Sequence, residues 1–232
     1  RVTGGPVRVA HAGDADVALL VDGERRALAA WRGHVLPPGA ELAVRGSGRG
    51  RFLVLAIGGL AVPRVLGSAS TYVRARLGGL DGRALAEGDR LPLEGGSGDV
   101  DGPDAGCDPH APPSPANGPP LVLHAVAGPQ HDAFDDAELE RFFEATWTLS
   151  AEADRMGARL DGPTLAHRNA AARDIVSDAI LPGSVQVPGS GQPIVMLADA
   201  HTAGGYPKIA TVLSSDLARL AGGPRSQVVR RH

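Results

Sequence analysis

Residues 194–220 read IVMLADAHTAGGYPKIATVLSSDLARL, and this stretch carries the pattern that decides the fold. An apolar run at each end predicts a strand, with a connection between the two runs. A plain connection needs one turn signal, whereas this one places Asp199, His201, a Gly pair, Tyr206 and Lys208 within a few positions. We therefore expect a β-rich fold in which this connection carries chemistry.

Short strands dominate the rest of the chain as well. Gly (32) and Pro (19) gather where apolar patterns stop, which is typical of many short strands. DDAELERFFEA predicts an amphipathic helix with an Asp as N-cap, and SDLARLAGG predicts a final helix with Ser215 as N-cap. The strands expected are VRVAH, ADVALLVDG, RALAAWRG, ELAVRG, RFLVLAIGG and LVLHAVAG, followed by a strand, turn and strand in TWTLSAEADRMGARLDG.

The expected class is mainly β (α+β), arranged as two lobes. A chain of 232 residues with 43% hydrophobic content suits one large domain or two lobes of roughly 100 residues each. We expect a first lobe over residues 1–93, a Pro/Gly-rich linker or loop over 94–120, and a second lobe over 121–232. The linker has almost no apolar side chains to bury, so we expect it to be mobile.

Composition argues against two classes of partner. Lys and Arg total 23 against 26 Asp and Glu, so the chain lacks the basic field that nucleic acid or anionic lipid would require. The longest apolar run, residues 52–62, is too short for a membrane helix. The absence of a leader-like start and the single Cys107 favour the cytoplasm, and Cys107 is expected to be an exposed bystander thiol.

Four polar clusters in the second lobe form the candidate site. Each follows an expected strand, and a rigid β scaffold that gathers polar loops is the usual setting of a small-molecule site. Each cluster alone also fits an ordinary turn. The four are GPQHDAF (128–134), SAEADRMGARL (150–160), SVQVPGSGQP (184–193) and DAHTAGGYPK (199–208).

Two pairs within these clusters have two interpretations each. Arg155 and Arg159 lie four positions apart, which either aims both at one anion or places them on a solvated basic face. Gly204 and Gly205 either expose consecutive backbone N–H groups to an anion or carbonyl oxygen, or meet a hairpin's need for positive φ.

Several common motifs are missing. GSGRG at 46–50 lacks the Gly-Lys-Ser/Thr ending of a phosphate-binding loop, and no Gly-x-Ser-x-Gly elbow occurs. The histidines show no paired metal spacing, so we expect no metal site.

The order GPQHDAF, ADRMGARLDG, GSVQVPGSGQPIVMLADAHTAGGYPK resembles the family of KipA, also named allophanate hydrolase subunit 2, which contains the C subunit of bacterial ATP-dependent 5-oxoprolinase. In the first lobe, AIGGLAVPRVLGSASTYVRARLGGLDGRALAEGDRL resembles the middle section of that family. The family is similar to the carboxyltransferase domain of urea carboxylase, which implies two cyclophilin-like β-barrel lobes. Its members usually carry a further N-terminal segment before the position of Arg1.

The resemblance also implies roles for individual residues. Asp199 would orient Lys208 or act as a base, although it could equally cap its own loop. Ala203 stands where the family commonly has a second Thr. The implied catalytic residues are Asp199, Tyr206 and Lys208. The implied substrate-binding residues are Gln130 and Asp132 for amide N–H groups, Arg155 and Arg159 for carboxyl-like oxygens, Gly204 and Gly205 beside a developing oxyanion, and Gln186 and Thr202.

The function implied is that of an enzyme subunit acting on a small amide or urea-like substrate. Either 5-oxoproline is opened with ATP or a carboxyl group is transferred, and ATP or carboxybiotin comes through partner subunits rather than binding this chain directly. The expected partner is a KipI-like subunit, the equivalent of the B subunit of 5-oxoprolinase. The alternative is a non-catalytic KipA-like regulator that binds a KipI-like kinase inhibitor.

Overall fold

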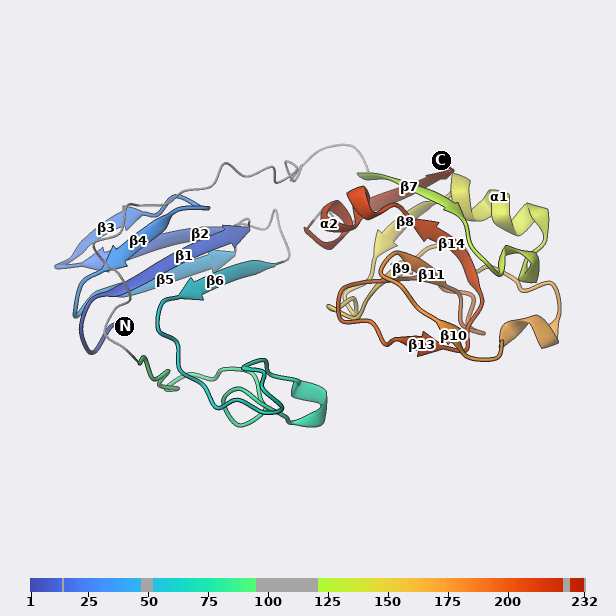
Figure 1. Cartoon of the computed structure of the whole chain (residues 1–232). Coiled ribbons are helices and arrows are strands. Elements are labelled where there is room, and N and C mark those ends of the chain that lie inside the picture. The colour runs from blue at the N-terminus through green and yellow to red at the C-terminus, as the bar shows by residue number, and fades with distance from the viewer. Residues whose placement is uncertain (14, 47–51, 95–120, 223–225, 232) are drawn as a thin grey trace. The chain divides into compact units, whose positions relative to one another are not determined.

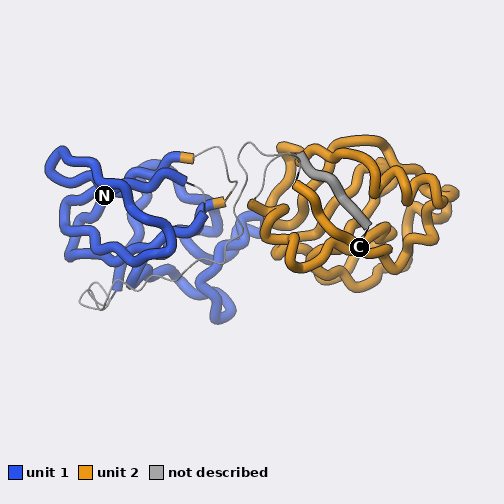
Figure 2. The backbone as a smooth tube through the Cα atoms, turned by 90° about the horizontal axis from the view of Figure 1, so that it is seen from above, with its two compact units in different colours: residues 1–45, 53–109 blue, residues 46–52, 110–232 orange. Residues whose placement is uncertain are grey.

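The structure, a computed structural model, describes residues 1–13, 15–46, 52–94, 121–222 and 226–231. Cys107 and nearly all of the expected linker lie outside the described residues. The described part is mostly β-strand with few helices, so the expected mainly β class is confirmed. The chain divides into two compact units, drawn from residues 1–45 and 53–109 and from residues 46–52 and 110–232 (Figure 2).

Unit 1 contains two small antiparallel sheets (Figure 1). One has the strand order β4-β1-β6 and the other β3-β2-β5. Residues 58–94 follow with isolated bridges and the short 3₁₀ helix η1 (Val73–Ala75). The strands are β1 (Val7–Gly13), β2 (Ala15–Val21), β3 (Glu24–Ala27), β4 (Gly33–Leu36), β5 (Glu41–Gly46) and β6 (Leu53–Ile57).

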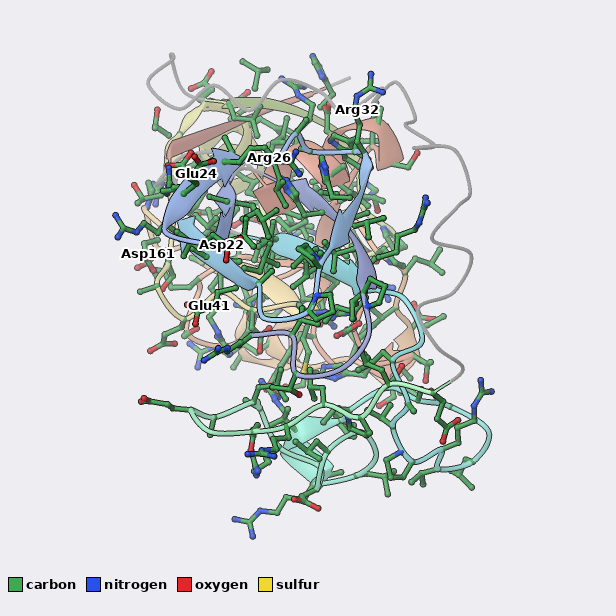
Figure 3. The ribbon with its side chains drawn as sticks, turned by 90° about the vertical axis from the view of Figure 1, so that its left-hand side faces the viewer. Asp22, Glu24, Arg26, Arg32, Glu41 and Asp161 are labelled. Atoms are coloured by element: carbon green, nitrogen blue, oxygen red, sulfur yellow. The ribbon has the colours of Figure 1, made fainter. Side chains whose placement is uncertain are left out.

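The core of unit 1 is small. Alternation along β1 turns Val7 and Val9 inward, where they join apolar residues of β2 and β4. On the other sheet, β3 pairs only with β2 among the described strands and exposes Glu24 and Arg26 (Figure 3). Charged side chains on an edge strand disfavour pairing with another chain. The apolar Leu66 remains 95% exposed.

Unit 2 is built on a closed barrel of seven strands in the order β11-β12-β9-β8-β15-β7-β14, closed by the pairing of β14 with β11. Strand β15 runs parallel to β7 and antiparallel to β8. A separate ladder joins β10 to β13. The strands are β7 (Leu121–Ala127), β8 (Thr146–Leu149), β9 (Gly157–Asp161), β10 (Asp178–Ala179), β11 (Ser184–Gln186), β12 (Ile194–Met196), β13 (Ala203–Gly204), β14 (Lys208–Val212) and β15 (Ser226–Arg231).

Two helices pack on this barrel. Helix α1 (Asp136–Glu144) occupies the predicted segment and buries Leu139, Phe142 and Phe143. Helix α2 (Ser214–Gly222) begins one residue before the expected N-cap Ser215, so Ser215 lies inside the helix and that detail of the prediction is wrong. The 3₁₀ helices η2 (His131–Ala133) and η3 (Ala170–Arg173) complete the unit.

A buried carboxylate ties α2 to β7. Asp216 accepts a hydrogen bond from the His124 amide at 2.7 Å and one from Arg219 Nη1 at 2.8 Å, and His124 Nδ1 lies 3.0 Å from its Oδ2. Burial raises the pKa of Asp216, but the hydrogen bonds from His124 and Arg219 outweigh it and hold the pKa below its ordinary value. The ionised carboxylate therefore stabilises the docked helix.

We predict that Asp216→Asn makes the stability of this protein less sensitive to acid. A folded-state pKa below the unfolded value of about 3.9 gives stability that is fully present above that value and is lost as pH falls through the folded pKa. The difference in free energy of unfolding between wild type and variant should therefore shrink from about pH 5 downward. Urea unfolding at several pH values measures it, with exposed Asp161→Asn as the control. A difference that stays constant with pH contradicts the prediction.

Candidate functional site

The candidate site is centred on the ammonium group of Lys208, the first residue of β14. Its side chain is only 3% exposed. Lys208 Nζ donates to Asp178 Oδ2 at 2.7 Å and to the Ala179 carbonyl at 3.0 Å. Both acceptors belong to β10, so a segment thirty residues away in sequence supplies the partners that a buried cation requires.

Gln130 links this pair to the end of β7. Its Oε1 accepts from the Lys208 amide at 3.2 Å, and its Nε2 donates to Asp178 Oδ2 at 3.1 Å. The Gln130 amide in turn donates to the Lys208 carbonyl at 3.3 Å. Gln130, Asp178 and Lys208 therefore form one network, which we call the Lys208 network.

Asp178 is the exposed member of the Lys208 network, with 49% of its side chain accessible. Its pKa is lowered, first by the hydrogen bond from Lys208, then by the Ala179 amide at 2.7 Å and by Gln130. The carboxylate is therefore ionised at neutral pH. The sequence analysis did not select Asp178, because it lies between apolar residues in IVSDAIL and outside the four polar clusters.

The glycine pair of the quoted stretch lies against β10. Neither Gly204 nor Gly205 has positive φ, so a hairpin's need for that conformation does not explain them. A Cβ on Gly204 would lie 2.6 Å from Ile180 Cδ1 and 2.9 Å from Gln186 Nε2, so the ends of these two side chains would have to move to admit it. The amide of Ile180 donates to the carbonyl of Thr202. Hydrogen-bonded and non-hydrogen-bonded pairs alternate along an antiparallel ladder, so Asp178 and Gly204, two positions away, are again a hydrogen-bonded pair. The amide of Gly204 therefore faces the carbonyl of Asp178.

Three other predicted residues surround this ladder. Gln186 on β11 is buried, and its Nε2 donates to the Tyr206 carbonyl at 3.4 Å. The side chain of Tyr206 is 42% exposed. Thr202 is exposed as well. Six predicted residues therefore lie on or beside the strands β10, β11, β13 and β14: Gln186, Thr202, Gly204, Gly205, Tyr206 and Lys208. The roles expected for them stay predictions.

The remaining predicted residues make other contacts. Arg155 forms an ion pair with Asp199, in which Nη2 donates to Oδ1 at 3.1 Å and Nε lies 2.9 Å from Oδ2. Both side chains are exposed. Asp199 was predicted to orient Lys208, to act as a base or to cap its own loop. In the structure the carboxylate bound to Lys208 is that of Asp178, and a role for Asp199 as a base stays a prediction. Arg159 Nε lies 3.8 Å from Glu152 Oε2.

Asp132 is exposed on η2, beside Gln130. Among the described residues, no group of three or more His, Cys, Asp or Glu side chains could hold a metal ion. The Lys208 network itself presents a fixed carboxylate supported by a buried cation and an amide.

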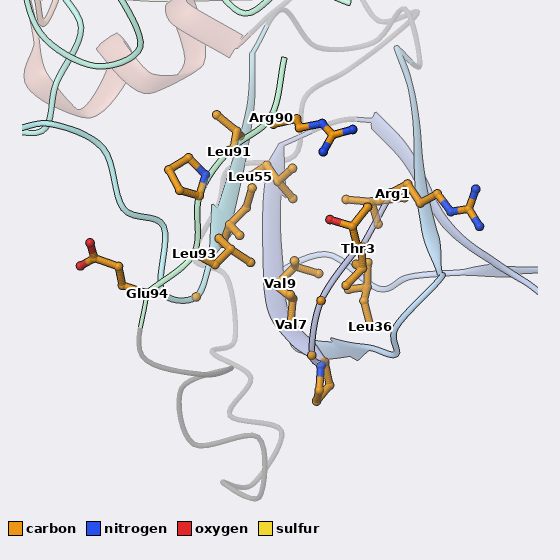
Figure 4. Close-up of a pocket in the computed structure, with 18 of the residues that line it drawn as sticks. Arg1, Thr3, Val7, Val9, Leu36, Leu55, Arg90, Leu91, Leu93 and Glu94 are labelled. Atoms are coloured by element: carbon orange, nitrogen blue, oxygen red, sulfur yellow. The ribbon is translucent and has the colours of Figure 1, made fainter. Parts of the chain in front are cut away.

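A separate groove of about 650 Å³ lies in unit 1 (Figure 4). Apolar residues of β1, β4, β5 and β6 form its walls, including Val9, Leu36 and Leu55. Arg1, Arg90 and Glu94 also line it. The sequence predicted a site in the second lobe and did not predict this groove, whose lining is mostly apolar with charged side chains among it.

Comparison with known proteins defines the family. The model of the carboxyltransferase domain, subdomains A and B, matches residues 2–230. The chain is 38% identical over 209 residues to the C subunit of 5-oxoprolinase from Escherichia coli, covering 87% of this chain and 63% of that protein. It is 31% identical over 182 residues to the urea amidolyase of Lachancea kluyveri, covering 69% of this chain and 10% of that protein.

A solved structure agrees with this result. The crystal structure of TTHA0988 matches with a TM-score of 0.74 at 31% identity, covering 98% of this chain and 42% of that one. The chain belongs to the carboxyltransferase domain family, and the predicted resemblance is confirmed. This chain spans 42% of the length of TTHA0988 and 63% of the length of the Escherichia coli relative. Within the described part, every helix is too short or too polar to cross a membrane.

We predict that Gly204→Ala destabilises unit 2 more than Gly205→Ala. The new methyl group at position 204 would overlap Ile180 and Gln186, and such overpacking typically costs about 1–3 kcal/mol. At position 205 the Cβ comes no closer than 3.2 Å, to the Ile175 carbonyl, so we expect a smaller loss. Chemical denaturation of both variants gives the free energies of unfolding. Equal losses of unfolding free energy in the two variants would contradict the prediction.

Proposed function

We propose that this chain is part of a subunit of a heteromeric enzyme that acts on a small amide or urea-like substrate. ATP-dependent 5-oxoprolinase is the first assignment, and biotin-dependent carboxyl transfer is the second. The observation that carries the proposal is the 38% identity to the C subunit of a 5-oxoprolinase along most of this chain. The match to a urea amidolyase supports the second assignment.

The Lys208 network supports this class of substrate. A small amide, lactam or urea presents N–H donors and a carbonyl oxygen. The half-exposed Asp178 carboxylate can accept from such N–H groups, and the exposed Tyr206 side chain carries a hydroxyl that can donate to an oxygen. The roles proposed for Arg155 and Arg159 remain contacts to carboxyl-like oxygens of the substrate, and that of Gly205 remains a contact to a developing oxyanion.

ATP, or carboxybiotin, is proposed to come from partner subunits. The exposed member of the Lys208 network is an anion, which repels the phosphates of a nucleotide, so ATP is not assigned to this site. A KipI-like subunit is the proposed partner, because the bacterial relatives are named as one lettered subunit of 5-oxoprolinase, an enzyme with several subunits. We further propose a cytoplasmic location and a cyclophilin-like fold for both units.

The alternative role, a KipA-like regulator without chemistry, has less support. The relatives matched along most of the chain are named for enzymes rather than for inhibitors of a kinase. A regulator also has no need of a half-exposed carboxylate backed by a buried ammonium.

The test is reconstitution with the subunits encoded by neighbouring genes. We expect co-elution on size exclusion at micromolar concentration and ATP-dependent loss of 5-oxoproline. Lys208→Met should lower turnover by about a hundredfold, because it releases the carboxylate that the substrate contacts. Exposed Arg173→Met in the same unit is the matched control and should keep normal turnover.

The outcomes separate the candidates. Turnover of 5-oxoproline supports the first assignment, whereas biotin-dependent carboxylation of urea without it supports the second. A complex that forms but converts neither substrate favours the regulator. Separate elution of the proteins would show that the proposed partner is wrong.

A further inference from the structure

We propose that Asp178 is the residue of the Lys208 network that binds the substrate, by accepting a hydrogen bond from an amide N–H, and that Lys208 is a positioning residue behind it. The inference rests on the proposed function, since it names the group that meets the substrate at the same site. It moves the N–H contact from Gln130 and Asp132 to a residue outside the polar clusters of the sequence.

Burial removes Lys208 from direct contact. Its side chain is 3% exposed, and two of its three N–H donors are used by Asp178 Oδ2 and the Ala179 carbonyl. With so little of the side chain accessible, direct contact between a substrate and Nζ is disfavoured. The positive charge of Lys208 therefore acts through Asp178.

Gln130 is similarly committed. Its carbonyl oxygen accepts from the Lys208 amide, and one of its N–H groups donates to Asp178. The oxygen keeps one lone pair, but it is a neutral acceptor, and hydrogen bonds to an ionised group such as the Asp178 carboxylate are stronger.

Asp178 has the accessibility and the open acceptor position that the contact requires. A carboxylate offers about four lone-pair positions. Lys208 Nζ and Gln130 Nε2 use two on Oδ2, and the Ala179 amide uses one on Oδ1. One position remains, on a side chain that is 49% exposed. Since the lowered pKa keeps the group ionised, it accepts hydrogen bonds and does not donate them.

The direction of this hydrogen bond defines the ligand class. An ionised acceptor favours an amide, lactam or urea group that carries an N–H. It disfavours an ester or lactone, whose oxygen would face the carboxylate with no proton between them. Hydrogen bonding to an N–H group rejects analogues that lack it, because the polar group of the site is then left unpaired.

The experiment compares 5-oxoproline with its lactone analogue, in which oxygen replaces the ring N–H. Binding of both to the purified chain is measured by calorimetry or ligand-observed NMR for wild type, Asp178→Asn, Lys208→Met and Asp135→Asn. Asp135 is a matched control, an exposed carboxylate paired with Arg168 in the same unit. Melting curves verify that each variant is folded.

We expect wild type to bind the lactam about 10- to 100-fold more tightly than the lactone, the range for a hydrogen bond to a charged group. Asp178→Asn should lose this preference, because Lys208 and Gln130 hold the remaining amide oxygen and an NH2 donor takes the place of Oδ1. Asp135→Asn should keep the preference. Lys208→Met should keep a preference for the lactam, because the carboxylate remains. A structural role alone for Asp178 would change the melting temperature and leave the ratio unchanged.

Three results would overturn the inference: no lactam binding by wild type, equal binding of lactam and lactone, or a ratio lost in Lys208→Met but retained in Asp178→Asn. The last would make Lys208 the direct contact. Failure of the proposed function is distinguishable, because a reconstituted complex without turnover would leave the Asp178-dependent lactam preference intact.

Discussion

A buried ammonium group must find acceptors, and this requirement organises one end of the barrel in unit 2. Lys208 enters β14 with its side chain enclosed, where an unpaired charge would be costly. The β10 segment lies against it and supplies a carboxylate and a backbone carbonyl. Gln130 then joins that carboxylate to the backbone of β14. Residues far apart in sequence therefore share one network because one cation has to be satisfied.

The two units differ in how well they can hold such a network. The sheet of unit 2 closes on itself and surrounds fully buried Trp147, Phe134 and Phe142. Closure pairs the strands on both sides, which removes sheet edges and keeps the strand ends in place. The sheets of unit 1 have three strands each, and large apolar side chains such as Leu66 and Val54 remain exposed. A rigid polar site is therefore expected in unit 2.

Patterns that are local in the sequence were the ones that could be predicted. Apolar alternation indicated β1 and β2, and the spacing of Leu139, Phe142 and Phe143 indicated α1. Asp178 could not be found in this way, because its importance comes from a partner thirty residues away rather than from its neighbours. The family resemblance selected Lys208 and Gln130, which do meet, but pairwise contacts such as Arg155 with Asp199 depend on tertiary structure.

The quoted stretch also shows why a polar loop cannot be interpreted as a list of functional groups. Its side chains face different surroundings: Asp199 is held by an exposed arginine, Tyr206 is accessible, and Lys208 is enclosed. A Cβ on Gly204 would meet the side-chain ends of Ile180 and Gln186. Chemistry at such a loop follows from which groups keep free hydrogen-bonding positions after the fold has used the rest. By that criterion β10 contributes as much to the polar surface of this barrel as the connection between the two apolar runs does. The sequence pattern alone gives no sign of this contribution.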